Sequence, residues 1–265
     1  MPKHPAFSVP DALTTLDTAI AGGTLARGRR ANGTDGLDMM SVFVPEAWVH
    51  GAGPGDGTWM SAFLDRGWPE WLVMLGVSLF MNDAGATRDR VASLAAAVGR
   101  PVDVSSEDAD AFLFARSFAR AISAPFGPTR ALHTFLRLRL GPGRHSVLAS
   151  LTALDGEWEG QVTVVRDALA MVERRLAGEE LERKEVRTVA KACRAASDRA
   201  ALSGSAEGAY VADLCGFAGA AVHPYGDVVL LALGRGSEVG PGSRALTASC
   251  RDSLLAALRA AAANR

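Results

Sequence analysis

Apolar residues recur along most of this chain at intervals of three and four, the spacing that places them on one face of an α-helix. A clear example follows Ser105, where the apolar positions are Phe112, Ala115, Phe118, Ala119 and Ile122. Ser105 and Asp108 have the spacing of a helix-capping box, although Asp103 or Ser106 could equally be the capping residue. This segment is therefore predicted to be a helix with one buried face.

Start and stop signals divide the pattern into segments of helical length. Proline or a short polar side chain precedes most of the predicted helices, and glycine follows several of them. The predicted helices begin near Ser8 and end at Gly22, run from Pro69 to Asn82, from Thr87 to Val98, from Ser105 to Pro125 and from Pro128 to Gly141, cover 146–154, 158–177, 179–202 and 206–222, and end with one capped by Ser243.

Two regions depart from this pattern. Residues 31–57 are rich in glycine and are predicted to form loops around one apolar element, residues 37–50, which Pro45 interrupts. Residues 228–233 form the one β-like run. The sequence therefore predicts a mainly α protein, an irregular helical bundle or array of about nine helices with at most one short β element. We expect a single domain over residues 1–265, with a possible subdivision into a Trp- and Gly-rich part, 1–125, and an Ala-rich part, 126–265.

The composition of the chain bears on its partners and on its location in the cell. Its 265 residues are 48% hydrophobic, and 28 Lys and Arg balance 29 Asp and Glu, so no global field favours nucleic acid or an anionic membrane. The longest apolar run, Trp71 to Met81, is too short to span a bilayer, and residues 1–10 do not resemble a signal peptide. Three widely spaced cysteines, Cys193, Cys215 and Cys250, are expected to be buried free thiols. We expect a cytoplasmic protein without a membrane segment.

The sequence contains no complete catalytic or cofactor-binding motif. The glycines of 234–240 follow the β-like run but lack the second strand and the acidic residue of a dinucleotide fold, and the glycine run ending at Gly57 lacks a Lys-Ser/Thr pair. The histidines have no metal-ligand spacing. We therefore expect no cofactor, no metal and no catalytic residue. The alternative is an enzyme whose site is dispersed between helices and involves His50, Asp56, Trp59, His133 and His223.

One charged pattern stands out on the segment 179–202. Arg183, Arg187, Lys191 and Arg194 are spaced four, four and three apart, so a helix would carry all four on one side. We call them the basic stripe. Glu179, Glu180, Glu182 and Glu185 are expected in the first turn of the same helix, where they could pair with the cations. The stripe is thus a solvated face, a contact for an acidic protein surface, or a phosphate contact of a nucleic-acid-associated regulator.

Tryptophans cluster near the glycine-rich loop, at Trp48, Trp59, Trp68 and Trp71. Such residues anchor a core, but partly exposed tryptophans also form interface hot spots. We therefore add Trp59 and the neighbouring Asp56, on the loop from His50 to Gly57, to the basic stripe as candidate partner-binding residues.

The runs RDALAMVERRLAG (166–178), EELERKEVR (179–187) and AKACRAASDRAA (190–201) resemble alanine-rich bacterial immunity proteins of polymorphic-toxin systems. Those proteins bind and block a toxin. The resemblance implies a neutralising or regulatory protein-binding role, with a toxin or effector as the partner. Because the net charge is close to zero, we do not expect nucleic acid as the partner. It assigns no functional residue.

Overall fold

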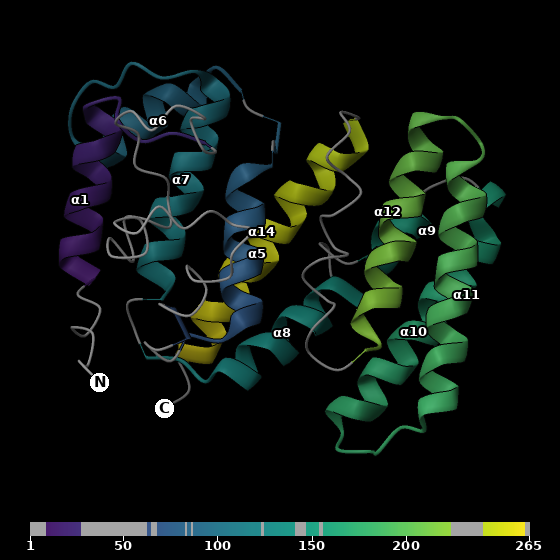
Figure 1. Cartoon of the computed structure of the whole chain (residues 1–265). Coiled ribbons are helices and arrows are strands. Elements are labelled where there is room, and N and C mark those ends of the chain that lie inside the picture. Colours follow the sequence, from purple (N-terminus) through teal and green to yellow (C-terminus); the bar gives the residue numbers. More distant parts are fainter. Residues whose placement is uncertain are drawn as a thin grey trace. The chain divides into compact units, whose positions relative to one another are not determined.

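The computed structural model describes residues 9–27, 63–64, 68–82, 84–85, 87–122, 125–140, 147–153, 156–223 and 241–262. Within these ranges the regular secondary structure is helical and contains no β-strand, which confirms the mainly α prediction (Figure 1). The chain divides into two compact units, Met1–Pro125 and Phe126–Arg265, at the boundary of the subdivision considered above. The β-like run, 228–233, and the apolar element, 37–50, lie outside the described residues.

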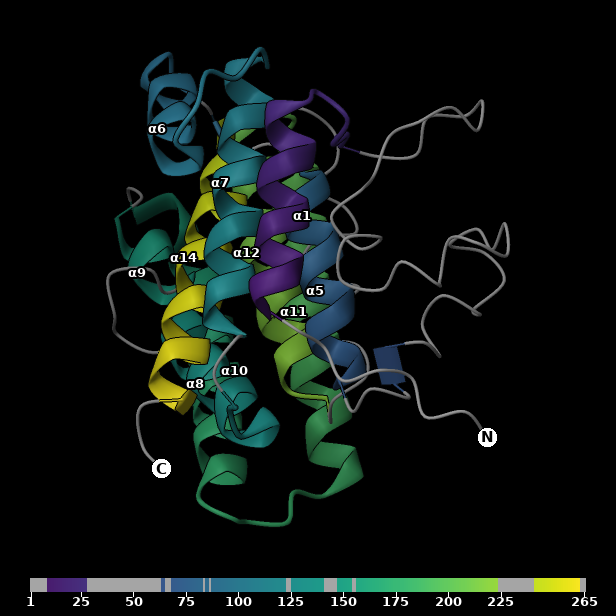
Figure 2. The ribbon, with the colours of Figure 1, turned by 90° about the vertical axis from the view of Figure 1, so that its left-hand side faces the viewer.

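The first unit contains α1 (Val9–Ala21), α5 (Glu70–Met81), α6 (Asp89–Val98) and α7 (Ser106–Ala121). Helix α7 is its centre, because α1, α5 and α6 each pack on it (Figure 2). Of the three candidate caps, Ser105 is the one that the structure shows: its Oγ accepts a hydrogen bond from the backbone N–H of Asp108 at 3.1 Å. Helix α7 ends at Ala121, earlier than predicted, and Ile122 forms its C-cap.

Aromatic side chains fill the interior of this unit. Phe80 of α5 stacks on Phe112 of α7 with ring centroids 6.1 Å apart. Trp71 is buried, and Trp68 contacts the rings of Phe63 and Phe118 at 5.4 and 6.3 Å. These two tryptophans therefore belong to the core, whereas Trp48 and Trp59 lie outside the described residues.

The second unit contains α8 (Pro128–Leu140), α9 (Val147–Thr152), the 3₁₀ turn η1 (Gly156–Trp158), α10 (Glu159–Leu176), α11 (Arg183–Ala201), α12 (Ala206–Ala221) and α14 (Pro241–Ala262). Helix α12 packs against α9, α10, α11 and α14, and nearly all of its side chains after the first turn are buried or half-buried. This matches its sequence, since a helix that is apolar all round belongs in a core. Helix α11 buries one narrow face, at Cys193, Ala196 and Ala200.

Two predicted helix starts are wrong. Helix α11 begins at Arg183 and not at Glu179, because Gly178, with φ 92°, turns the chain sharply after α10 and residues 179–182 form the connection. Helix α14 begins at Pro241, before the predicted cap Ser243, since the fixed φ of proline suits a first helical position. Among the described residues, no helix combines the length and apolar character needed to cross a membrane.

Candidate functional site

Helices α11 and α12 lie side by side, and small residues bring them close together (Figure 1). A Cβ atom on Gly219 would stand 2.8 Å from Cβ of Cys193, so this contact requires glycine. Nearby, Oγ of Ser197 donates a hydrogen bond to the carbonyl of Ala212 at 2.8 Å. The small residues and this hydrogen bond thus hold α11 and α12 against each other.

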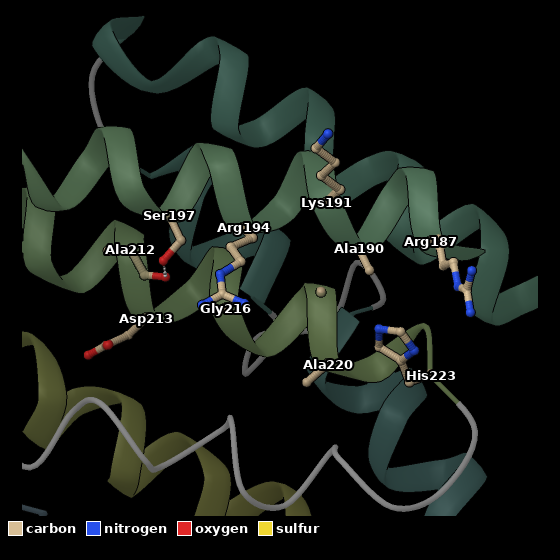
Figure 3. Close-up of a pocket in the computed structure, with 11 residues that line it drawn as sticks. Arg187, Ala190, Lys191, Arg194, Ser197, Ala212, Asp213, Gly216, Ala220 and His223 are labelled. Atoms are coloured by element: carbon tan, nitrogen blue, oxygen red, sulfur yellow. Dashed lines mark hydrogen bonds between the residues drawn. The ribbon is translucent and has the colours of Figure 1, made fainter. Parts of the chain in front are cut away.

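A hollow of about 410 Å³ lies along this helix pair (Figure 3). A second hollow, also of about 410 Å³, adjoins it and shares Arg187 and His223 with it. We call the two together the basic groove. The lining residues of the first hollow are Arg187, Ala190, Lys191, Arg194 and Ser197 from α11, Ala212, Asp213, Gly216, Gly219 and Ala220 from α12, and His223 just beyond it.

All four residues of the basic stripe line this groove. Arg187, Lys191 and Arg194 line the first hollow, and Arg183 and Arg187 line the second. Arg194 extends from α11 toward α12, whereas the ammonium group of Lys191 points away from α12 (Figure 3). Among the described residues, none of the four side chains has an ion-pair or hydrogen-bond partner. In the described part of the chain, these cations therefore lack ion-pair partners, although Asp213, Glu179 and Glu180 also line the groove.

The acidic residues before and within α11 do not neutralise the stripe. Glu179 and Glu185 both bind the guanidinium of Arg174 on α10, with Nε of Arg174 at 2.9 and 3.0 Å from the Glu179 oxygens. Hydrogen bonding by Arg174 lowers the pKa of Glu179. Of the four glutamates, only Glu185 lies in the first turn of α11, because the helix begins at Arg183. The predicted pairing with the stripe is therefore wrong for Glu179 and Glu185.

Asp213 is the one acidic residue among those that line the first hollow. Burial raises its pKa to about 6, and no described residue supplies a hydrogen bond or an opposite charge to its carboxylate. In Figure 3 the carboxylate points away from Arg194. A half-buried carboxyl without compensation in a hollow is a feature found more often at binding sites than in a structural core.

Arg175 holds the end of α12 where the groove meets His223. Its guanidinium donates hydrogen bonds to the carbonyls of Ala221 and Val222 at 2.6 and 2.7 Å, which satisfies carbonyls that the helix itself leaves unpaired. Burial lowers the pKa of the half-buried His133 on α8, and the charges of Arg137 and Arg175 lower it further. The neutral form of His133 is thereby favoured.

Of the residues of the alternative, dispersed active site, the structure describes only two. His133 and His223 both belong to the second unit, whereas His50, Asp56 and Trp59 lie outside the described residues. Within the described ranges, no three His, Cys, Asp or Glu side chains are grouped so that they could hold a metal ion. Cys193 and Cys215 are buried free thiols, as predicted, and burial raises the pKa of each to about 12. They are poor nucleophiles at neutral pH.

The α12 side of the groove was not predicted from the sequence. Small residues recur at Gly208, Ala212, Gly216 and Ala220, each four positions after the last, so that one face of α12 carries no large side chain; this pattern could have indicated the floor of the groove. Asp213 gave no sequence signal, because its burial depends on the packing of several helices. Comparison with known proteins gives no match: no family model fits the chain, and no curated protein or solved structure is significantly similar to it.

Proposed function

We propose that this chain is a binding protein that holds an acidic segment of a partner protein in the basic groove. In keeping with the resemblance to immunity proteins, the partner is a toxin or effector and the role is neutralising or regulatory. The proposal includes a cytoplasmic location, which suits three free thiols.

The observation that carries the proposal is the set of groove cations that have no ion-pair partner among the described residues. Arg187 and Arg194 line the groove in this way. Glu179 and Glu180 also line the second hollow, but Glu179 is held by Arg174, and no described ion pair joins either glutamate to the basic stripe. A set of cations held along one helix attracts and orients an anionic partner. An acidic partner would supply the missing charges.

The shape of the groove favours a polypeptide over a small molecule. Residues from Arg183 to Ser197 line the two hollows along α11, which corresponds to about 20 Å of helix at 1.5 Å per residue. The lining from α12 is mostly backbone and small apolar side chains, Ala212, Gly216 and Ala220. A long groove with an apolar floor and charged rim suits a protein segment better than the sugar-phosphate backbone of a nucleic acid, which is contacted mainly through charge.

Titration of the full chain with poly-L-glutamate at low and physiological ionic strength tests the proposal. We expect saturable binding, and the variant R187E/K191E/R194E should lose at least about tenfold in affinity, because it reverses three groove charges. The matched control is R166E/K184E/R199E, which reverses three exposed cations of the same unit that do not line the groove. It should bind within about twofold of the wild type.

Equal losses in both variants would show a non-specific charge effect and would reject the groove as the site. A parallel titration with single-stranded DNA decides between anion classes. Tighter binding of the DNA, lost in the groove variant, would replace the protein partner by a nucleic acid.

A further inference from the structure

Three glycines of α12 stand in different surroundings. A Cβ atom on Gly208 would lie 1.8 Å from Oγ of Ser203, and one on Gly219 would lie 2.8 Å from Cβ of Cys193, so packing explains both. On Gly216 the nearest described atom would be Oγ of Ser197 at 4.0 Å. Among the described residues, nothing fills the space beside Gly216.

Glycine within a helix lowers its stability relative to alanine, and the packing of the described residues does not require it at position 216. Gly216 lines the basic groove between Ala212 and Ala220 (Figure 3). Since a glycine permits the closest approach to a helix backbone, this is the point at which a bound segment can come nearest to α12.

The cations fix the geometry of the bound segment. Arg187 and Arg194 are seven residues apart on α11, which corresponds to two turns and a rise of about 10.5 Å. In a second helix lying along the groove, carboxylates at positions i and i+7 are separated by the same rise and share one face. In an extended strand, side chains on one face recur about every 6.6 Å, so that neither one nor two repeats match this separation.

We propose that the occupant of the basic groove is an acidic α-helix of the partner protein, which packs closely on α12 at Gly216 and presents carboxylates two turns apart to Arg187 and Arg194. This inference rests on the proposed function and specifies the partner segment. In this helix-in-groove interaction, the small residues of α12 allow the partner helix to approach closely. The cations Arg187 and Arg194 determine how far the partner helix is shifted along the groove.

Two synthetic peptides of about 20 residues serve as probes. Both have the same sequence of glutamate, alanine and leucine, with glutamates at i, i+4 and i+7 on one face and alanines beside them. A side-chain cross-link holds the first as a helix, and alternating D-residues prevent helix formation in the second. We expect the helical peptide to bind the full chain at least about tenfold more tightly than its isomer.

The variant Gly216→Leu fills the floor without changing any charge. It should weaken binding of the helical peptide by about tenfold or more and leave binding of the flexible isomer unchanged. Its matched control is Gly160→Leu, at an exposed position of α10 where an added Cβ meets no described atom. The smaller variant Gly216→Ala, whose Cβ fits the described surroundings, should give an intermediate loss and covers the case in which Gly216→Leu does not fold.

Equal affinity of the two peptides, or unchanged helix binding by both Gly216 variants, would overturn the helix inference. Failure of both peptides to bind would overturn it as well. In either case the poly-L-glutamate titration decides separately whether the groove binds acidic chains. If that binding survives in R187E/K191E/R194E, the proposed function itself fails.

Discussion

Replacement of Asp213 by asparagine is expected to stabilise the protein above about pH 6. The carboxyl of Asp213 has an ordinary pKa of 3.8 that burial raises to about 6 in the folded chain. The folded state therefore binds a proton more tightly than the unfolded state, and stability falls as the pH rises from about 4 through about 6. A pKa shift of one unit between the unfolded and folded states corresponds to about 1.4 kcal/mol. The ionised carboxylate therefore lowers the free energy of unfolding by about 2–3 kcal/mol at neutral pH.

Asparagine keeps the shape of the side chain and removes its charge. We expect D213N to exceed the wild type in free energy of unfolding by about 2–3 kcal/mol near pH 8, with the difference shrinking toward zero below about pH 4, where the wild-type carboxyl is protonated in both states. Urea unfolding of both proteins across this pH range measures the difference, with the denaturant dependence of each compared to check that the transitions are equivalent. The control is D252N, at an exposed position of α14.

A stability difference that is absent near pH 8, or that persists unchanged below pH 4, would refute this reasoning. The first result would mean that the carboxylate is compensated in the folded chain. The second would mean that the substitution acts through packing and not through charge. If D213N is stabilising, the groove carries a cost to the fold, as binding sites commonly do.

Two other substitutions test the packing of the fold. Gly219→Ala should destabilise the chain by about 1–3 kcal/mol, because its Cβ would collide with Cβ of Cys193. Gly216→Ala should raise the melting temperature and stabilise the chain by about 0.5–1 kcal/mol, because alanine favours the helix and its Cβ meets no close described atom. The opposite order of the two variants in thermal unfolding would contradict the assigned contact between α11 and α12. Asp17→Asn should cost about 2–4 kcal/mol, because it leaves the buried Arg116 guanidinium, bound by Asp17 at 2.5 and 2.8 Å, without its counter-charge. A loss below about 0.5 kcal/mol in urea unfolding would mean that this ion pair is dispensable.

Local signals in the sequence predicted the helices well where a cap or a breaker acts within a few residues. The hydroxyl of Ser105 caps α7 as its spacing indicated, and the proline at 128 begins α8 as expected. The start of α11 was wrong because acidic residues at 179–182 suit a connection as well as a first turn. The turn at Gly178 and the contacts of Arg174 decide between these possibilities, and neither is a property of the helix pattern alone.

For the candidate site, the spacing of the basic stripe predicted which side of α11 its cations share, and the structure places all four along one groove. The other side of the groove, which α12 forms, could not be predicted from the sequence. The contact of Cys193 with Gly219 sets which face of α12 meets α11, and the burial of Asp213 depends on the packing of several helices. Both depend on contacts between residues distant in sequence, which periodicity does not encode.

The central claim is that acidic chains bind in the basic groove, and hydrogen exchange of the full chain with and without saturating poly-L-glutamate tests it most directly. Our account predicts slower amide exchange in α11 from Arg183 to Ser197 and in α12 from Ala212 to Ala220, with little change in α1, α5 and α6. Slower exchange confined to other helices, or none under conditions of saturated binding, would contradict it.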